Sequence, residues 1–145
     1  MNVADTREIT IVGAGLAGAL QAVLLAQQGF CVRLFERNAD PRSGGQAGGR
    51  SINLALAERG RHALQRAGLL EAVDEYTIPM RGRMLHDRDG NLTLQPYGAR
   101  DDEVIYSVHR AKLNRTLLDA AESTGCITCH FEHRLEDIDW DRRVL

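Results

Sequence analysis

The chain has 145 residues, enough for one domain and too few for two ordinary ones. Hydrophobic residues make up 43% and charged residues 26%, which is the balance of a globular protein. The formal net charge is −2, which argues against nucleic acid or an anionic membrane as the main partner.

The longest nearly apolar stretch, residues 13–26, contains Gln21 and is shorter than the ~20 residues that span a bilayer. The N-terminal segment carries Asp5 and Glu8, whereas a signal peptide carries only basic residues there. Three cysteines are an odd number and too few for a disulfide framework, so reduced thiols are expected. We therefore expect a soluble, cytoplasmic chain without a membrane segment.

The first elements form a predicted βαβ unit. A β-branched run at 8–12 predicts a buried parallel strand, and a glycine-rich turn at 13–18 ends it. Residues 16–28 predict a helix that Gly29 ends, and a second strand follows at 31–36. Parallel strands need such a crossover, so the predicted fold class is α/β.

The middle of the chain changes from helical to alternating periodicity. Residues 40–48 belong to a polar, glycine-rich loop to which we assign no role, and residues 57–73 predict a helix. Residues 80–86 and 92–95 alternate between apolar and polar, and the turn signal at 87–91 separates them. This pattern predicts a β-hairpin.

The last third predicts a return to the α/β pattern. Strands are expected at 104–108, 126–131 and 134–138, and a helix at 110–123 that Gly125 ends. A doubly wound sheet that takes in the strand at 104–108 would be only partly built by the last residue. We therefore expect this chain to be the front portion of a larger protein.

The residue pattern with the clearest chemistry is Gly13-x-Gly15-x-x-Gly18, which lies between the first strand and the first helix. In this context the glycines permit a tight turn, close approach of a pyrophosphate, and close helix–strand packing. Glu36 stands 23 residues after Gly13, where an acid contacts a ribose hydroxyl. The acid favours FAD or NAD over NADP, and the motif alone does not separate FAD from NAD.

The cysteine–histidine cluster near the end of the chain suggests a zinc site at first sight. No residues separate the pair Cys126 and Cys129 from His130, whereas zinc fingers place about a dozen there. On a strand the two cysteines would also point to opposite faces. We therefore expect no metal.

Six strings, taken together and in order, are more specific than the glycine motif: GRSINLAL at 49–56, RGR at 59–61, IPMRGRM at 78–84, PYG at 96–98, SVHRAKLN at 107–114 and HFEHRL at 130–135. In this order they resemble the kynurenine 3-monooxygenases, a branch of the flavin aromatic hydroxylases. The resemblance covers nearly the whole chain.

The resemblance implies an incomplete Rossmann-like FAD-binding domain with the first hairpin of a β-sheet substrate domain. Residues 1–78 would be the first part of the FAD-binding domain, 79–98 the hairpin, and 99–145 a truncated return to the FAD-binding domain. The implied reaction is the hydroxylation of L-kynurenine to 3-hydroxy-L-kynurenine through a flavin C4a-hydroperoxide. FAD would be the bound cofactor, NADPH the transient reductant and O₂ the co-substrate, in tryptophan degradation toward quinolinate and NAD.

The resemblance also implies roles for individual residues, with no protein side chain acting as a catalytic group. Arg83 and Tyr97 would grip the substrate carboxylate, which suits a guanidinium and a phenol. The residues implied to contact the cofactor are Gly13, Gly15, Ala17, Gly18, Phe35, Glu36, Arg37, Asn38, Ala55, Arg110 and Leu135.

Other interpretations remain beside this one. The chain could belong to a flavin hydroxylase of another carboxylated aromatic, or it could be a non-catalytic nucleotide-binding module. Alone it is expected to be weakly folded and inactive. Arg50, Arg59 and Arg61 could attract the phosphates of NADPH, although a solvated helix flank is the favoured interpretation. The sequence leaves the oligomeric state open.

Overall fold

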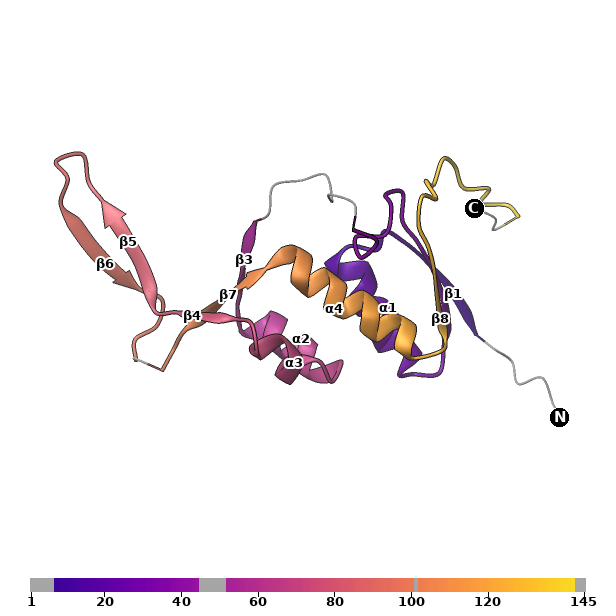
Figure 1. Cartoon of the computed structure of the whole chain (residues 1–145), viewed down its shortest axis with the longest axis horizontal. Helices are drawn as coiled ribbons and strands as arrows, with labels where there is room; N and C mark the ends of the chain where they lie inside the picture. Colours follow the sequence, from indigo (N-terminus) through magenta and orange to yellow (C-terminus); the bar gives the residue numbers. More distant parts are fainter. Residues whose placement is uncertain (1–6, 45–51, 101, 143–145) are drawn as a thin grey trace. The chain divides into compact units, whose positions relative to one another are not determined.

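The computed structural model describes residues 7–44, 52–100 and 102–142, and the chain divides into two compact units (Figure 1). The first unit is Met1–Arg50 with Ala111–Leu145, and the second is Ser51–Arg110. These units are defined by contacts within the chain. The division by expected function into 1–78, 79–98 and 99–145 stays a prediction. No helix in the described part of the chain is long and apolar enough to cross a membrane.

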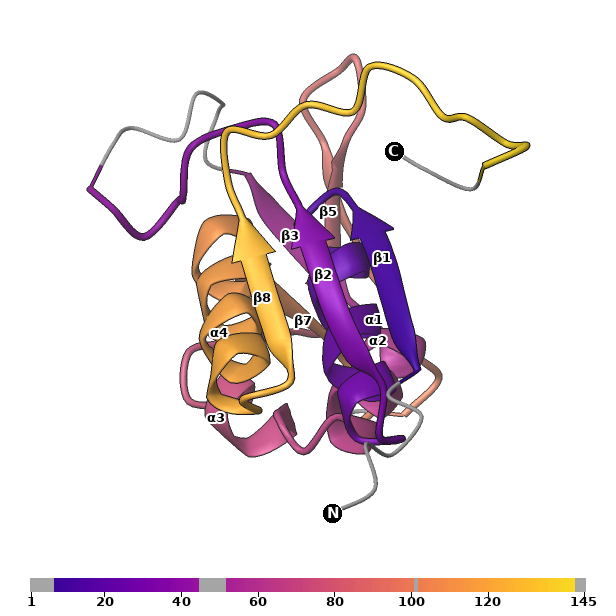
Figure 2. The same cartoon turned by 90° about the vertical axis from the view of Figure 1, so that its right-hand side faces the viewer.

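The first unit is built on a three-stranded parallel sheet with the order β1-β2-β8, and helices cover one of its faces (Figure 2). The predicted βαβ unit is confirmed, with Ile9 opposite Val32 and Ile11 opposite Leu34. The strands are β1 (Glu8–Val12), β2 (Cys31–Phe35) and β8 (Ile127–His130), and the helices are α1 (Leu16–Ala26) and α4 (Arg110–Ser123).

The core of the first unit lies between the sheet and these helices. Val32 and Leu34 point from the central strand into it and are almost fully buried. Small residues on α1 let the helix approach the sheet closely. The inward face predicted for α4 is confirmed, because all four of its members are buried: Leu113, Leu117, Leu118 and Ala121.

An ion-pair network ties the loop after β2 to α4. The Arg42 guanidinium lies 2.8 Å from Asp40 and 2.8 Å from Glu122, and 3.1 Å from Asp119. Arg115 Nε also donates to the Pro41 carbonyl oxygen at 3.1 Å. The start of the loop to which the sequence assigned no role is thus held against the helix. Residues 45–48 of that loop lie outside the described residues.

The second unit contains an antiparallel sheet with the order β3-β7-β4, a separate hairpin, and two short helices. The hairpin predicted from the alternation is confirmed, with Gly90 at a φ of +86° in its turn. The sheet strands are β3 (Asn53–Leu56), β4 (Ile78–Met80) and β7 (Ile105–His109); the hairpin strands are β5 (Gly82–His86) and β6 (Leu92–Pro96); the helices are α2 (Glu58–Arg66) and α3 (Leu70–Asp74).

Three predicted elements differ from the structure. The strand expected at 104–108 in the doubly wound sheet is β7, and it pairs with β3 and β4 instead. The helix expected over 57–73 is two helices, because Gly68 adopts a φ of +74° and ends the first one. The strand expected at 134–138 is irregular, since the chain turns at Glu132 (φ +59°) and bonds to the loop after β2.

Arg61 has a structural role in the second unit and is not a solvated flank residue. Its guanidinium forms a two-point ion pair with Asp74 on α3, with Nη2 2.9 Å from Oδ2. The same group lies 4.1 Å from the centre of the Tyr106 ring on β7. The hydrogen bond to Asp74 raises the pKa of the guanidinium above its usual range. Arg61 therefore joins α2, α3 and the sheet.

Replacing Arg61 by alanine is expected to lower the free energy of unfolding by about 2 kcal/mol, because an ion pair and a cation–π contact are both lost. The matched control is Arg59→Ala, which removes an exposed arginine from the same helix. Its effect should stay within about 0.5 kcal/mol. Thermal and urea unfolding of the two variants measures the difference, and equal losses would contradict a structural role for Arg61.

Candidate functional site

The glycine motif forms a tight turn between β1 and α1. Gly13 has a φ of +102°, and its N–H donates to the Phe35 carbonyl oxygen of the neighbouring strand at 2.6 Å. A Cβ atom added to Gly18 would lie 1.9 Å from the Gly13 carbonyl oxygen and 3.4 Å from Ile11 Cγ2. No side chain fits at Gly18, so this glycine is what allows α1 to begin against the turn and pack on β1.

Among the described residues, nothing accepts a hydrogen bond from the backbone N–H groups at the start of α1. The first hydrogen bond of the helix runs from Ala19 N–H to the Gly15 carbonyl oxygen at 2.9 Å, so the N–H groups of Leu16, Ala17 and Gly18 precede it. Gly15 supplies no capping side chain, and the first turn carries no acid. A Cβ added to Gly15 would meet no atom within 4 Å. Open space beside free donors suits a pyrophosphate.

Glu36, directly after β2, is held beside this turn. Its Oε2 accepts a hydrogen bond from Ala14 N–H at 3.0 Å, and its Oε1 accepts from the Asn38 N–H at 2.9 Å and the Asn38 side-chain amide at 2.6 Å. A carboxylate offers about four acceptor positions, two on each oxygen, so Oε2 keeps one position for a ribose hydroxyl. The donors orient the carboxylate at the place where the sequence analysis expected the ribose.

The charge of Glu36 is favoured by its surroundings. Burial raises the pKa of the carboxyl, but hydrogen bonds from Asn38 and Ala14 and the charge of Arg37 outweigh burial, so its pKa lies below the ordinary value of 4.5. The carboxylate contribution to stability is therefore present above about pH 4.5 and is lost as the pH falls through the lowered pKa of the folded state.

Replacing Glu36 by glutamine is expected to weaken FAD binding by about 10-fold to 100-fold, because charged hydrogen bonds are replaced by neutral ones. The loss should shrink only as the pH falls through the lowered pKa of Glu36, below its ordinary value of 4.5, since the wild-type carboxyl then becomes protonated as well. FAD titrations of wild type and variant from about pH 8 down to about pH 3 measure this. The control Glu75→Gln, an exposed glutamate after α3, should bind FAD like wild type at every pH.

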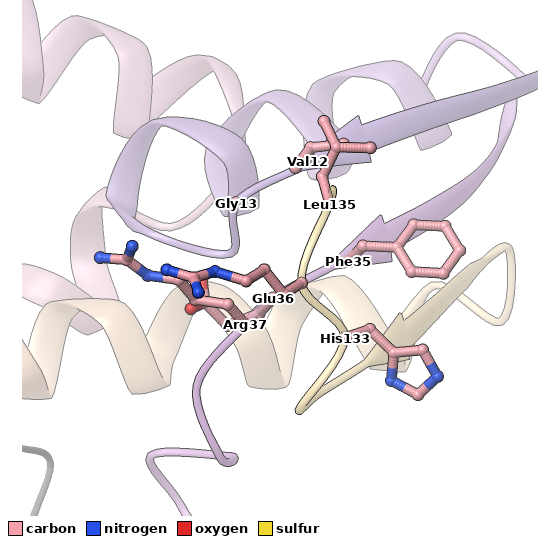
Figure 3. A pocket seen from close by; sticks show the side chains of 8 residues that line it. Val12, Gly13, Phe35, Glu36, Arg37, His133 and Leu135 are labelled. Atoms are coloured by element: carbon pink, nitrogen blue, oxygen red, sulfur yellow. The ribbon is translucent and has the colours of Figure 1, made fainter. Parts of the chain in front are cut away.

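Eight residues of the first unit line a pocket of about 200 Å³ beside the Gly13 turn (Figure 3). In Figure 3, Phe35 and His133 project to the same side, while Glu36 and Arg37 lie beneath the turn. Sequence reasoning had named five of the eight and missed three: Val12, His133 and Arg134. The positions of His133 and Arg134 just after β8 could have predicted their place at the pocket. The carboxyl ends of parallel strands lie at the same edge of a sheet, so residues that follow β8 lie near those that follow β1 and β2.

The pocket wall is fixed by backbone bonds between two distant segments. The Glu132 N–H donates to the Asn38 carbonyl oxygen at 3.0 Å, and the His133 N–H donates to the Glu36 carbonyl oxygen at 2.9 Å. The Phe35 and His130 rings stack with their centres 4.6 Å apart. The turn at Glu132 thus carries Leu135 to the pocket, where the sequence analysis expected it near the adenine.

The two remaining residues expected to contact the cofactor belong to the second unit. Ala55 is exposed on β3, where it pairs with Ser107 of β7. Arg110 is exposed at the start of α4, and its N–H donates to the Ile52 carbonyl oxygen at 3.2 Å. Ala55 therefore lies within the β3–β7 strand pair, and Arg110 lies directly after its end. Their contact with a cofactor stays a prediction.

The hairpin brings the two expected substrate residues to one face. Arg83 pairs with Gln95, and Arg83 Nε donates to Gln95 Oε1 at 2.7 Å. Tyr97 continues the pairing, because its N–H donates to the Arg81 carbonyl oxygen at 2.9 Å. Arg83 and Gln95 stand opposite each other and share a face, and the alternation of the strand assigns Tyr97, one residue past the end of β6, to the same face. Gln95, which sequence reasoning missed, leaves both Nη groups of Arg83 able to fork onto a carboxylate.

The N–H groups at the start of α1 and the Glu36 carboxylate lie along one edge of the parallel sheet. Dinucleotide-binding α/β proteins place their phosphate donors and their ribose acceptor in the same way. Similarity to known proteins identifies which kind of dinucleotide-binding protein this chain is. The chain belongs to the FAD binding domain family, which matches residues 6–143. The open cradle at Gly15 and the placement of Glu36 fit the pyrophosphate and adenosine ribose of FAD.

Curated relatives carry a more specific name. The kynurenine 3-monooxygenase of Xanthomonas campestris pv. campestris (strain 8004) is 54% identical over 138 residues, which are 95% of this chain and 30% of that protein. The chain thus spans about a third of the length of the curated relatives that it matches.

Solved structures share the fold. The p-nitrophenol 4-monooxygenase PnpA from Pseudomonas putida DLL-E4 superposes with a TM-score of 0.76 at 19% identity, over 94% of this chain and 35% of that one. PqsL of P. aeruginosa, solved in complex with 2-aminobenzoylacetate, gives a TM-score of 0.74 at 25% identity, over 96% of this chain and 37% of that one. An incomplete Rossmann-like FAD-binding domain is therefore the fold class, as the sequence predicted.

Proposed function

We propose that this chain is the amino-terminal part of an FAD-dependent kynurenine 3-monooxygenase that converts L-kynurenine to 3-hydroxy-L-kynurenine with NADPH and O₂. The observation that carries the proposal is the 54% identity to a relative of that name over 95% of the chain. The cradle for pyrophosphate and ribose supports the FAD part of the proposal, and the guanidinium of Arg83, held by Gln95, is compatible with a carboxylate substrate.

In the proposed enzyme, the first unit binds the adenosine half of FAD. The N–H groups at the start of α1 would hold the pyrophosphate, and Glu36 would accept hydrogen bonds from the ribose. Phe35, Arg37, Asn38 and Leu135 would surround the adenosine, and Ala55 and Arg110 would contact the flavin half. Bound FAD supplies the activation of O₂ for hydroxylation, which no side chain of the chain can provide.

The hairpin would bind and orient the substrate. The two Nη groups of Arg83 match the two oxygens of a carboxylate, and the Tyr97 hydroxyl adds one directed donor. Gln95 fixes the guanidinium through Nε, which limits the directions from which the carboxylate can approach. Fixing the carboxylate of a small aromatic substrate also fixes where its ring lies, which is the positioning that hydroxylation at one ring carbon requires.

The bound molecule of one structural relative supports the substrate class. PqsL was solved with 2-aminobenzoylacetate, an aromatic amine with an ortho carbonyl chain that ends in a carboxylate. Kynurenine contains the same 2-aminobenzoyl group and also carries a carboxylate. The same observation favours a second candidate, a flavin hydroxylase of another carboxylated 2-aminobenzoyl compound.

The test uses the full-length protein that contains this chain, purified with FAD. NADPH oxidation and O₂ uptake are measured with L-kynurenine and, separately, with 2-aminobenzoylacetate, and the products are identified by mass and chromatography. Formation of 3-hydroxy-L-kynurenine in proportion to NADPH consumed is the expected result. Hydroxylation of 2-aminobenzoylacetate alone would favour the second candidate, and bound FAD without turnover of either compound would contradict both.

A further inference from the structure

Two of the three cysteines lie at equivalent places in the first unit. Cys31 begins β2 after the glycine turn that ends α1, and Cys126 precedes β8 after the glycine turn that ends α4. The Val32 N–H donates to the Cys126 carbonyl oxygen at 2.8 Å, and Val32 is paired with Ile127. Cys31 and Cys126 are therefore neighbours one step before the first rung of the β2–β8 ladder.

The side chains of these two cysteines share one face of the sheet. Val32 and Ile127 are buried under the helices, so the residues just before them point to the opposite face. Burial and then the neighbouring Cys126 thiol raise the pKa of the Cys31 thiol, as expected of two sulfurs that lie close together. Adjacent strands are about 4.8 Å apart, within the range of Cα separations that a disulfide spans without backbone movement.

The third cysteine cannot join this pair. Cys129 is paired with Leu34 and therefore faces the helix-covered side of the sheet. Burial raises the pKa of its thiol to about 11, and it lies on the face of the sheet opposite the pair, so it cannot bond to either sulfur. It therefore serves as an internal control.

We propose that Cys31 and Cys126 form a reversible disulfide when the protein meets hydrogen peroxide, which makes this pair a redox modification site. The inference does not depend on the proposed function. Cys126 is exposed and is the sulfur that peroxide reaches first, whereas Cys31 is partly covered.

The chemistry needs two steps and one equivalent of peroxide. The Cys126 sulfur attacks one peroxide oxygen, the O–O bond breaks, and a sulfenic acid and one water form. The Cys31 sulfur then attacks the sulfenic sulfur, the S–O bond breaks, and the leaving hydroxide takes the Cys31 proton to form a second water. Two thiols are oxidised by two electrons, and one peroxide is reduced to two waters.

The position of the bond determines its effect. The cysteines stand at the amino ends of the strands, whereas Gly13, Glu36 and the pocket stand at the carboxyl ends. The bond would close a loop of about 95 residues, a length for which a crosslink stabilises strongly. The oxidised protein should therefore keep FAD affinity and unfold about 5 °C higher than the reduced protein.

The experiment titrates the reduced, full-length protein with hydrogen peroxide, blocks remaining thiols with N-ethylmaleimide, and maps peptides without reduction. The expected result is a peptide pair joined through Cys31 and Cys126, which dithiothreitol separates. Cys31→Ser should abolish the pair and leave Cys126 as a trappable sulfenic acid, and Cys129→Ser should form the pair like wild type. Oxidation of Cys126 without a link to Cys31, or equal effects of Cys31→Ser and Cys129→Ser, would overturn the proposal.

Discussion

Replacing Gly18 by alanine is expected to destroy FAD binding and to lower the free energy of unfolding by about 3 kcal/mol. This is the upper end of the usual stability cost of inserting an extra carbon atom into a packed site. The added Cβ would stand 1.9 Å from the Gly13 carbonyl oxygen, and that atom is backbone. Neither partner can rotate away, so either the turn or the start of α1 must move. Both changes displace the N–H groups that would hold the pyrophosphate. Thermal unfolding and FAD content of the purified full-length protein measure the two losses.

Gly15→Ala is the matched control for this prediction. The added Cβ meets no atom within 4 Å, and Gly15 has an ordinary φ of −70°, so folding should be unchanged. The methyl group would instead occupy the space in which the phosphates are expected to approach. FAD affinity should therefore fall about 10-fold or more, which corresponds to the loss of one hydrogen bond to a phosphate. Wild-type stability and FAD content in Gly18→Ala would contradict the close approach of α1 to the turn.

Replacing Arg83 by alanine is expected to lower kcat/KM for kynurenine about 100-fold, the usual cost of losing a bidentate partner for a carboxylate. This prediction depends on the proposed function. Arg83→Lys should recover little, because an ammonium group cannot fork onto two oxygens. Arg88→Ala, in the turn of the same hairpin, should behave like wild type. Steady-state kinetics of the FAD-loaded enzyme tests all three.

Gln95→Ala separates positioning from binding in the same site. Gln95 holds Arg83 through one 2.7 Å hydrogen bond, so its loss should raise KM about 10-fold and change kcat little. A general loss of hairpin structure would instead lower activity with every variant in it, including Arg88→Ala. An unchanged KM in Gln95→Ala would show that Arg83 keeps its direction without this partner.

The local patterns in the sequence were enough for several elements. The β-branched run, the glycine turn and the small residues of α1 predicted the βαβ unit, and Glu36 was expected at the end of β2. The buried face of α4 followed from helical spacing, and the hairpin followed from alternation around a glycine turn. Each of these features depends on residues close together in the chain, so sequence spacing alone was sufficient.

Tertiary pairing decided the remaining features. β7 has the composition of a buried parallel strand, yet it pairs antiparallel with β3, a strand of four residues that is too short to be predicted. The segment after β8 turns at Glu132 because the backbone of residues 36–38 offers it hydrogen-bond partners. Neither choice is encoded in local periodicity, because strand pairing is chosen by residues far apart in the sequence.

The same distinction holds for the side chains of the candidate site. The resemblance pointed to Arg83 and Tyr97 one by one, whereas the hairpin register places Gln95 opposite Arg83 and a backbone bond to Arg81 holds Tyr97 beside the hairpin. Arg61 looked like an exposed basic residue until Asp74 and Tyr106 were brought to it. The sequence determined which residues can do the chemistry, and the packing of distant segments decided which of them meet, because contact energies depend on distances that the chain order does not specify.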